Sequence, residues 1–477
     1  MSRAWLWGIL VLIAAGLVLY SQTVSFVWDE GFHLLAAQLI LDGKKPYLDF
    51  CFPQTPLNAY WNAAWMRLFG ENWRVTHYVA ALEAAGAVFL IAQYVLSRFP
   101  VPNWRTACAI TVALFVGLNI VTVEFGTSAQ AYGLGLLLCV AAFRCAVLAP
   151  RGTGLASSFG TGLAAGTGAA STLLTAPVVP VLFVWMLIYS KSRRAAKAIA
   201  FLVGLLLPFA PVFWLFAQGP RRVFFNVVEY QALFRRANWT GAMEHDLAVF
   251  SGWLDSTQVL LLALLAAAGA LFLIKKQGWT REQRAEFALA GWLAAALLVY
   301  ISTAHPTFER YYIFALPFLA VLAAAGLYHM GPRLSGRADP GWPALLVCVL
   351  VTLAVGKDLL NDWGNARWSD SEQVAAKVQA VTRRTAMLYA DEQVYFLLHW
   401  PPPPGMEFSY SHSLELPPAQ EKLFHVISEN ELAQQIAAGR FDTVETCKDD
   451  LIDKYKLTGR FRQEADVGDC SVFWGKK

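Results

Sequence analysis

The sequence predicts a polytopic α-helical membrane protein that ends in a small water-soluble α/β domain. Of its 477 residues, 57% are hydrophobic and 15% charged, and the mean hydropathy is +0.44. Soluble proteins carry about 25% charged residues, and disordered chains are polar, so both classes are excluded. Charge is also divided unevenly. Residues 1–360 hold 16 acidic and 25 basic residues, and residues 361–477 hold 18 acidic and 13 basic residues. We therefore expect a membrane block over 1–360 and a soluble domain over 361–477.

Apolar stretches within the membrane block predict about eleven transmembrane helices, because a bilayer core requires about 20 mostly apolar residues per helix. The expected spans cover residues 4–22, 76–97, 106–124, 129–148, 155–174, 177–190, 198–217, 253–274, 286–303, 311–330 and 342–360. The fifth and sixth meet at Thr175-Ala176-Pro177, where proline favours a break. This pair is expected either as two spans or as short re-entrant pieces. The first range is interpreted as a span rather than a cleaved signal peptide, because no small-x-small pattern follows it.

The distribution of lysine and arginine predicts the orientation. Basic residues are concentrated in the short loops that lie inside if the amino terminus is cytoplasmic, and eleven spans then place the acidic tail outside the cytoplasm. An oxidising compartment favours a disulfide between Cys447 and Cys470, which are the two cysteines of the tail. Within the tail we expect helices over 370–386 and 429–438. Strands are expected over 394–398, 423–427, 442–446 and 471–474.

The first outer loop, residues 23–75, is predicted to form two interfacial helices. The loop begins with the sequence Trp28-Asp29-Glu30-Gly31-Phe32-His33. Two adjacent carboxylates are unusual at a membrane surface, and two interpretations explain them. One interpretation is helix capping, with Asp29 as N-cap of a helix over 31–42 that Gly43 ends. The other is catalysis, which capping does not exclude. A second helix is expected from Thr55 as N-cap to Phe69.

The motifs of this loop resemble those of the C-type (GT-C) membrane glycosyltransferases. The resemblance rests on Asp29-Glu30 after the first span, on Pro46-Tyr47-Leu48-Asp49-Phe50 and on Pro53-Gln54-Thr55-Pro56-Leu57 followed by Tyr60. A weaker match is Arg310-Tyr311 before Pro317. Within that group the chain is similar to the branch of protein O-mannosyltransferases, lipid A aminoarabinose transferases and lipopolysaccharide-core transferases. The resemblance implies an inverting transfer of sugar from a polyprenyl-phosphate donor at the outer face of a bacterial plasma membrane.

The resemblance also implies roles for individual residues. Asp29 is expected to be the general base and Glu30 to help orient it or the acceptor. Gln54 stands where several relatives carry a basic residue or histidine, and it is expected to contact substrate. Further substrate contacts are expected from Glu124, His305, Arg310 and Tyr311, and the departing phosphate is assigned first to Arg310. The alternative for Glu124 is an interfacial acid exposed to water. Anchoring of a helix start is the alternative role of Arg310. Arg221, Arg222, Arg235 and Arg236, in the outer loop 218–252, are second choices.

Other features narrow the function classes. Neither His-x-x-x-His nor Cys-x-x-Cys occurs, so no metal site is predicted and no cofactor is expected. The open alternative is a divalent cation, Mg²⁺ or Mn²⁺, held by two acids near a phosphate. Positive charge is spread over many loops, which does not predict nucleic-acid binding. The expected partners are the lipid-linked donor, membrane lipids and an acceptor that is a lipid, a glycan or a protein. A transporter or flippase of lipid-linked sugars is the alternative function. A membrane scaffold that presents the tail is a third, but it leaves the Asp29–Glu30 pair unexplained.

Overall fold

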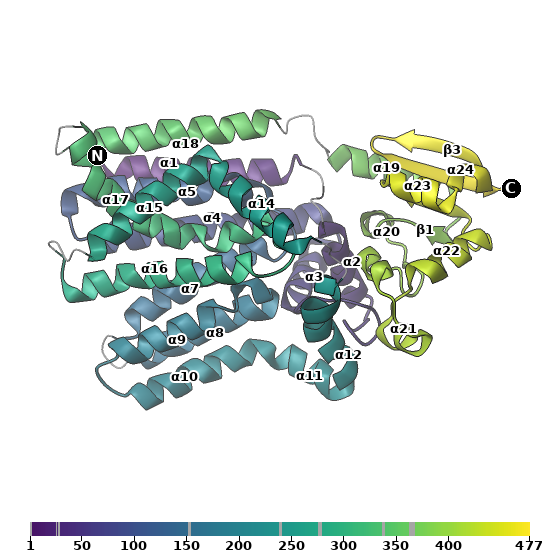
Figure 1. Cartoon of the computed structure of the whole chain (residues 1–477), viewed down its shortest axis with the longest axis horizontal. Helices are drawn as coiled ribbons and strands as arrows, with labels where there is room; N and C mark the ends of the chain where they lie inside the picture. The colour runs from purple at the N-terminus through teal and green to yellow at the C-terminus, as the bar shows by residue number, and fades with distance from the viewer. Residues whose placement is uncertain are drawn as a thin grey trace. The chain divides into compact units, whose positions relative to one another are not determined.

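The computed structural model describes residues 2–24, 26, 29–150, 154–237, 241–274, 279–335, 339–361 and 368–477. The chain divides into two compact units (Figure 1). Unit 1 comprises Met1–Gln22, His77–Ala210 and Gly241–Gly364, and unit 2 comprises Thr23–Thr76, Pro211–Thr240 and Asn365–Lys477. The second unit therefore combines the first outer loop and part of the 218–252 loop with the tail.

Unit 1 is a bundle of long apolar helices. Its α-helices are α1 (Arg3–Ser21), α4 (Trp73–Arg98, which starts in unit 2), α5 (Arg105–Gly117), α6 (Ile120–Glu124), α7 (Tyr132–Leu148), α8 (Leu155–Ser171), α9 (Val178–Tyr189), α10 (Arg194–Leu206), α14 (Ala242–Asp255), α15 (Thr257–Ile274), α16 (Arg281–Ser302), α17 (Leu316–Ser335) and α18 (Gly341–Asn361). Short 3-10 turns are η1 (Pro102–Trp104), η2 (Leu173–Thr175), η3 (Leu207–Phe209) and η5 (Glu309–Phe314). Every predicted span overlaps a helix of this set.

Six helices in the described part of the chain are long and apolar enough to cross a membrane, judged by length and composition. They are Arg3–Ser21, Trp73–Arg98, Arg194–Gln218, Thr257–Ile274, Arg281–Ser302 and Gly341–Asn361. The predicted span 106–124 is interrupted, and so is the apolar stretch 155–190, which holds two predicted spans. The range 106–124 breaks where Asn119 caps α6 by accepting a hydrogen bond from the Val121 amide. The range 155–190 breaks at η2, next to Pro177, as the proline predicts.

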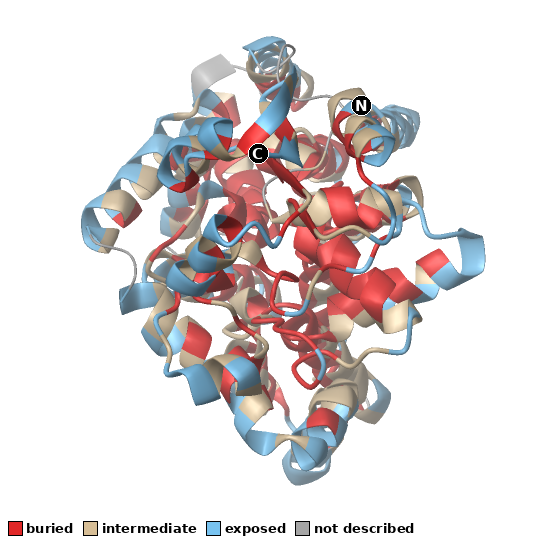
Figure 2. Ribbon diagram, turned by 90° about the vertical axis from the view of Figure 1, so that its right-hand side faces the viewer, coloured by how far each residue is buried: buried red, intermediate tan, exposed pale blue. Residues whose placement is uncertain are grey.

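Small residues let the helices of unit 1 approach closely. A Cβ atom at Gly162 would collide with the Phe201 carbonyl, and one at Gly204 would collide with the Phe159 carbonyl, so α8 and α10 pack backbone to backbone. Many helices are buried along one side and exposed along the other (Figure 2). The exposed sides carry large apolar residues such as Leu12 and Leu264, as lipid contact requires.

Unit 2 has two hydrophobic cores, one within the tail and a larger one shared by three stretches of chain. The first stretch supplies α2 (Glu30–Leu41) and α3 (Leu57–Phe69). The second supplies most of α11 (Ala210–Gln218), then α12 (Pro220–Phe224), the π-helix η4 (Phe225–Phe234) and α13 (Arg235–Ala237). The third is the tail, whose helices are α19 (Trp368–Val381), α20 (Glu392–Leu398), α21 (Pro418–Phe424), α22 (Glu429–Ala437), α23 (Asp449–Tyr455), α24 (Leu457–Arg460) and the 3-10 turn η6 (Ser409–Ser413).

The tail contains a four-stranded mixed sheet in the order β1-β2-β4-β3. The strands are β1 (Leu388–Tyr389), β2 (Thr443–Thr446), β3 (Phe461–Val467) and β4 (Cys470–Lys476). β1 and β2 are parallel, and the other pairs are antiparallel. Thr446 pairs with Ser471. This register brings Cys447 beside Cys470, and the two form a disulfide.

Two predicted strands of the tail are wrong. Residues 394–398 belong to helix α20, and residues 423–427 contain the end of α21 and a turn at His425, whose φ is 56°. A short apolar run fits a buried helix as well as a strand, and both helices have start signals that the prediction overlooked. Asp391 precedes α20, and Pro418 stands at the first position of α21. The expected helix over 429–438 and the strands over 442–446 and 471–474 are confirmed to within about two residues, and the helix expected over 370–386 is found as α19, which ends at Val381.

Candidate active site

The Asp29–Glu30 pair opens α2, a helix with ten buried residues. Glu30 is fully buried, and Asp29 is the N-cap residue, but its side chain accepts no capping hydrogen bond from the helix. The predicted boundaries of this helix are confirmed to within a residue. Capping therefore does not account for the Asp29 carboxylate. Trp28 lies outside the described residues.

His33, one turn along α2, is a neighbour of the pair that the sequence analysis did not single out. Its ring is buried against Phe32 and Phe52, and its Nδ1 has no hydrogen-bond partner among the described residues. Burial lowers the pKa of His33 to about 4, although the charges of Asp29 and Glu30 act in the opposite direction. The imidazole is therefore neutral near pH 7. It offers the carboxylates a polar neighbour without balancing their negative charge.

Gln54 lies in the connector between α2 and α3, which side chains of the 211–240 segment hold in place. The Tyr47 hydroxyl donates to the Gln54 carbonyl over 2.6 Å. The side-chain amide of Gln231 donates to the Pro53 carbonyl over 2.6 Å. The backbone amide of Phe52 donates to the side-chain oxygen of Asn226 over 2.9 Å. The predicted N-cap of α3 is corrected by one residue, because Pro56 occupies that position and Thr55 precedes it.

Tyr230 of the π-helix η4 connects this segment electrostatically with Asp29. Burial is the main cause that raises the pKa of its phenol, the charges of Cys51 and Asp29 raise it further, and Arg235 lowers it. Tyr230 is therefore within electrostatic range of both Asp29 and Arg235. π-Helical turns are rare and frequent at functional sites. Two other arginines of the segment have partners, since Arg221 pairs with Glu229 and Arg222 donates to the Leu48 carbonyl.

Arg310, in unit 1, is buried among aromatic rings. Its guanidinium carbon lies 4.3 Å from the ring centroid of Phe308, 5.6 Å from Tyr311 and 5.8 Å from Phe125. Its Nε donates to the Tyr132 hydroxyl over 3.2 Å. A snorkelling anchor would extend its head group into water, but Arg310 is only 5% exposed. This burial favours a recognition role over anchoring. Glu124, which ends α6 beside Phe125, is half-buried.

His305 is paired with Asp246, a buried acid of α14 that the sequence analysis missed. The His305 Nδ1 contacts the Asp246 carboxylate, whose other oxygen accepts a hydrogen bond from the Thr307 amide over 2.6 Å. A carboxylate on one ring nitrogen fixes the orientation of an imidazole and directs its other nitrogen outward. The sequence signal for Asp246 was its position next to His245 in an apolar stretch. That signal does not indicate His305 as the partner.

The predicted site residues thus form two groups, one in each unit. Asp29, Glu30 and Gln54 belong to unit 2, and Glu124, His305, Arg310 and Tyr311 belong to unit 1. Among the described residues, Glu445, Cys447 and Cys470 are the grouping with metal-ligand spacing. Both of its sulfur atoms are engaged in the disulfide.

No family model and no curated protein matches the sequence. The structure is similar to ArnT from Cupriavidus metallidurans, which was crystallised in the apo state and bound to undecaprenyl phosphate. For both structures the TM-score is 0.69 and the identity 14%, with 99% of this chain and 98% of that chain covered. The archaeal oligosaccharyltransferase AglB from Archaeoglobus fulgidus has a TM-score of 0.56 and 11% identity, covering 93% of this chain and 69% of that one. The chain therefore has the GT-C fold of polytopic membrane proteins, as its motifs predict.

Proposed function

We propose that this protein is a membrane glycosyltransferase that moves a sugar, with inversion, from a polyprenyl-phosphate carrier to an acceptor hydroxyl. The observation that carries the proposal is the fold shared with ArnT over nearly the whole length of both chains, because ArnT was crystallised with undecaprenyl phosphate. The acceptor is a lipid, a glycan or a protein. The reaction takes place at the outer face of a bacterial plasma membrane, where the positive-inside pattern puts the first loop and the tail.

In this proposal Asp29 is the general base. Its carboxylate takes the proton of the acceptor hydroxyl while that oxygen attacks the anomeric carbon. The bond between the anomeric carbon and the phosphate oxygen breaks, and polyprenyl phosphate leaves with the electron pair. The burial of α2 supports this role, because a base held at the start of a buried helix loses little entropy on reaching the reactive geometry. Buried Glu30 is assigned to positioning.

Arg310 is proposed to contact the donor phosphate. A guanidinium matches phosphate oxygens with paired N–H donors, and the low-polarity aromatic surroundings of Arg310 strengthen such a contact. His305, oriented by Asp246, is proposed as a further substrate contact.

The test is an assay of the purified protein in lipid nanodiscs with polyprenyl-phosphate sugars and a membrane-lipid acceptor. We expect release of polyprenyl phosphate that depends on the acceptor, and a glycoside product whose anomeric configuration, read by NMR, is inverted. A product with retained configuration would contradict the single displacement. Movement of intact donor across the bilayer without cleavage would instead favour the flippase alternative.

A further inference from the structure

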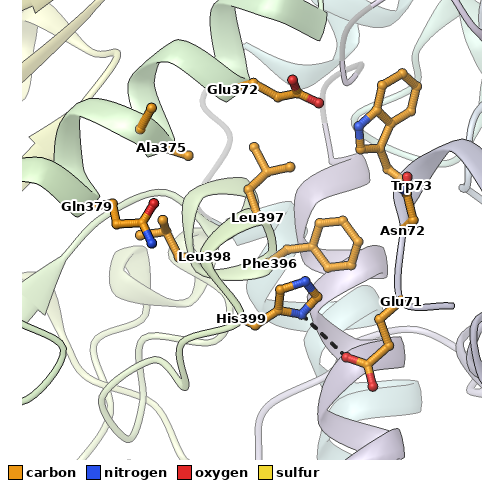
Figure 3. A pocket seen from close by; sticks show the side chains of 11 residues that line it. Glu71, Asn72, Trp73, Glu372, Ala375, Gln379, Phe396, Leu397, Leu398 and His399 are labelled. Atoms are coloured by element: carbon orange, nitrogen blue, oxygen red, sulfur yellow. Dashed lines mark ion pairs between the residues drawn. The ribbon is translucent and has the colours of Figure 1, made fainter.

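A polar pocket lies within unit 2. It has a volume of about 280 Å³ and is lined by residues 71–73, by α19 and by the end of α20 (Figure 3). Ligand pockets typically measure about 300–1,000 Å³, so this pocket is at the small end of the range and suits a ligand of about one small ring. Trp73, on its wall, is also the first residue of the candidate span α4. The pocket therefore adjoins a membrane-spanning helix.

The polar groups of the lining are rich in acceptors. Glu71 and Glu372 supply carboxylates, Asn72 and Gln379 supply amides, and His399 supplies an imidazole. In Figure 3, Glu372 and Gln379 extend from α19, while Glu71 and His399 extend from the other side. Carboxylates accept hydrogen bonds, and amides both donate and accept. This mixture is complementary to a ring that carries several hydroxyl groups.

One wall of the pocket is preorganised. His399 ends α20 with a φ of 51°, and its Nδ1 lies 2.6 Å from the Gln38 amide nitrogen and 3.4 Å from a Glu71 carboxylate oxygen. Phe396, Leu397 and Ala375 supply apolar surface between the polar walls. A binding site with a few fixed polar groups on an apolar base selects the orientation of its ligand.

The charge of the lining restricts the class of ligand. The pocket contains two glutamates and neither lysine nor arginine. The nearest arginine in sequence, Arg74, is not part of the lining, since it stacks on Trp73 and Trp368 at 4.5 and 4.3 Å. Anions are therefore disfavoured, and a neutral or positively charged ligand is favoured.

We propose that this pocket is a carbohydrate-binding subsite for one neutral or amine-bearing sugar ring. Binding to the pocket does not depend on the transferase proposal. Its use to recognise the glycan part of a membrane-attached acceptor does rest on that proposed function.

The test uses saturation-transfer NMR on the full chain in nanodiscs, with methyl glucoside, glucosamine and glucuronate as probes. We expect saturable binding of the first two, tighter for glucosamine, and none of glucuronate. Glu372→Gln should weaken glucosamine about two- to fivefold, the effect of an exposed ion pair, and leave methyl glucoside unchanged. Ala376→Trp, which fills the pocket from its exposed rim, should abolish both signals. The matched control Glu464→Gln, at an exposed position of β3, should change neither.

The proposal is overturned if glucuronate binds as tightly as glucosamine, or if Ala376→Trp leaves binding intact. Because the probes lack a carrier lipid, the assay requires no sugar transfer. Absent binding in a protein that transfers sugar would remove only this inference. Retained binding in a protein without transferase activity would remove only the proposed function and the acceptor role of the pocket.

Discussion

Helices α2 and α20 begin with the same two residues, and they place them in different surroundings. Asp29–Glu30 opens α2, and Asp391–Glu392 opens α20; in both, the aspartate is an N-cap residue without a side-chain capping bond. The two helices meet within unit 2, where a Cβ at Gly31 would lie 2.9 Å from the Gln393 amide nitrogen. An Asp-Glu pair at a helix start therefore does not define a function by itself.

The difference lies in the neighbours of each pair. The Asp391 amide donates to Glu445 over 2.9 Å, and the Ser409 amide donates to Glu392 over 2.6 Å. Desolvation, followed by the charge of Asp391, raises the pKa of Glu392 to about 7, and burial raises the pKa of Glu445. The tail acids thus lie within electrostatic range of one another, and burial favours their protonated forms. The α2 pair instead faces a neutral histidine, and Tyr230 lies within range of Asp29.

The largest expected effect is a difference in the rate of sugar transfer between variants of the Asp29–Glu30 pair and variants of the Asp391–Glu392 pair. Asp29→Asn should lower the rate of sugar transfer by about 10²- to 10⁴-fold, the usual contribution of a general base, while Asp391→Asn should retain transfer. The measurement is the initial rate of polyprenyl phosphate release, with circular dichroism to verify folding. Equal rates for Asp29→Asn and the unmodified protein would eliminate Asp29 as the base.

The second prediction concerns stability and pH in the tail. Glu392 has a folded pKa of about 7, above its ordinary value, so the folded state binds more protons than the unfolded state between about pH 4.5 and 7. Stability should fall as pH rises through that window. Glu392→Gln should reduce this slope, to which Glu407, whose pKa is also raised to about 7, still contributes, and should stabilise the protein at pH 8 by up to about 3 kcal/mol. Thermal unfolding of the full chain at pH 5 and 8 tests it, with exposed Glu464→Gln as the control, and an unchanged slope would contradict it.

The sequence predicted much of the fold because long apolar runs and interfacial aromatic residues are local signals. Helices α2 and α3 were predicted from capping residues and helical spacing, and the break before Pro177 from the proline. The disulfide of Cys447 with Cys470 was predicted from the expected oxidising compartment of the tail and its two cysteines. Strand predictions failed at 394–398 and 423–427, because a short apolar run fits a helix as well as a strand.

The candidate site was predictable only in part, because its neighbours come from distant stretches of chain. Asp29 and Arg310 were identified by motifs. Asp246, 59 residues from its partner His305, and Tyr230, which follows the first loop by more than 150 residues, have no local signal that names their partners. The sharing of one core by the first loop, the 211–240 segment and the tail is likewise a long-range feature.

The third prediction tests the close approach of the two helices. Gly31→Ala puts a methyl group against the Gln393 backbone, which must move, and overpacking of this kind costs about 1–3 kcal/mol. The matched control is Gly459→Ala in α24, where a Cβ would meet nothing within 4 Å. Chemical unfolding of both variants measures the difference. Equal stability would show that α2 and α20 do not depend on this contact.

The smallest expected effect gives the α2 site a pH dependence opposite in sign to that of the tail. His33 has a folded pKa of about 4, below its ordinary value of about 6.5, so the unfolded state binds the extra proton between these values. The neutral, buried ring should therefore lower stability as pH falls, by about 1 kcal/mol at pH 5.5. His33→Gln should flatten this acid-side loss without affecting the tail slope. Its effect at pH 8, where the ring is neutral in both states, reports the packing loss alone. If His33→Gln left the acid-side slope in place, the histidine would be charged in the folded protein, and the contrast between a neutral neighbour at α2 and acidic neighbours at α20 would fail.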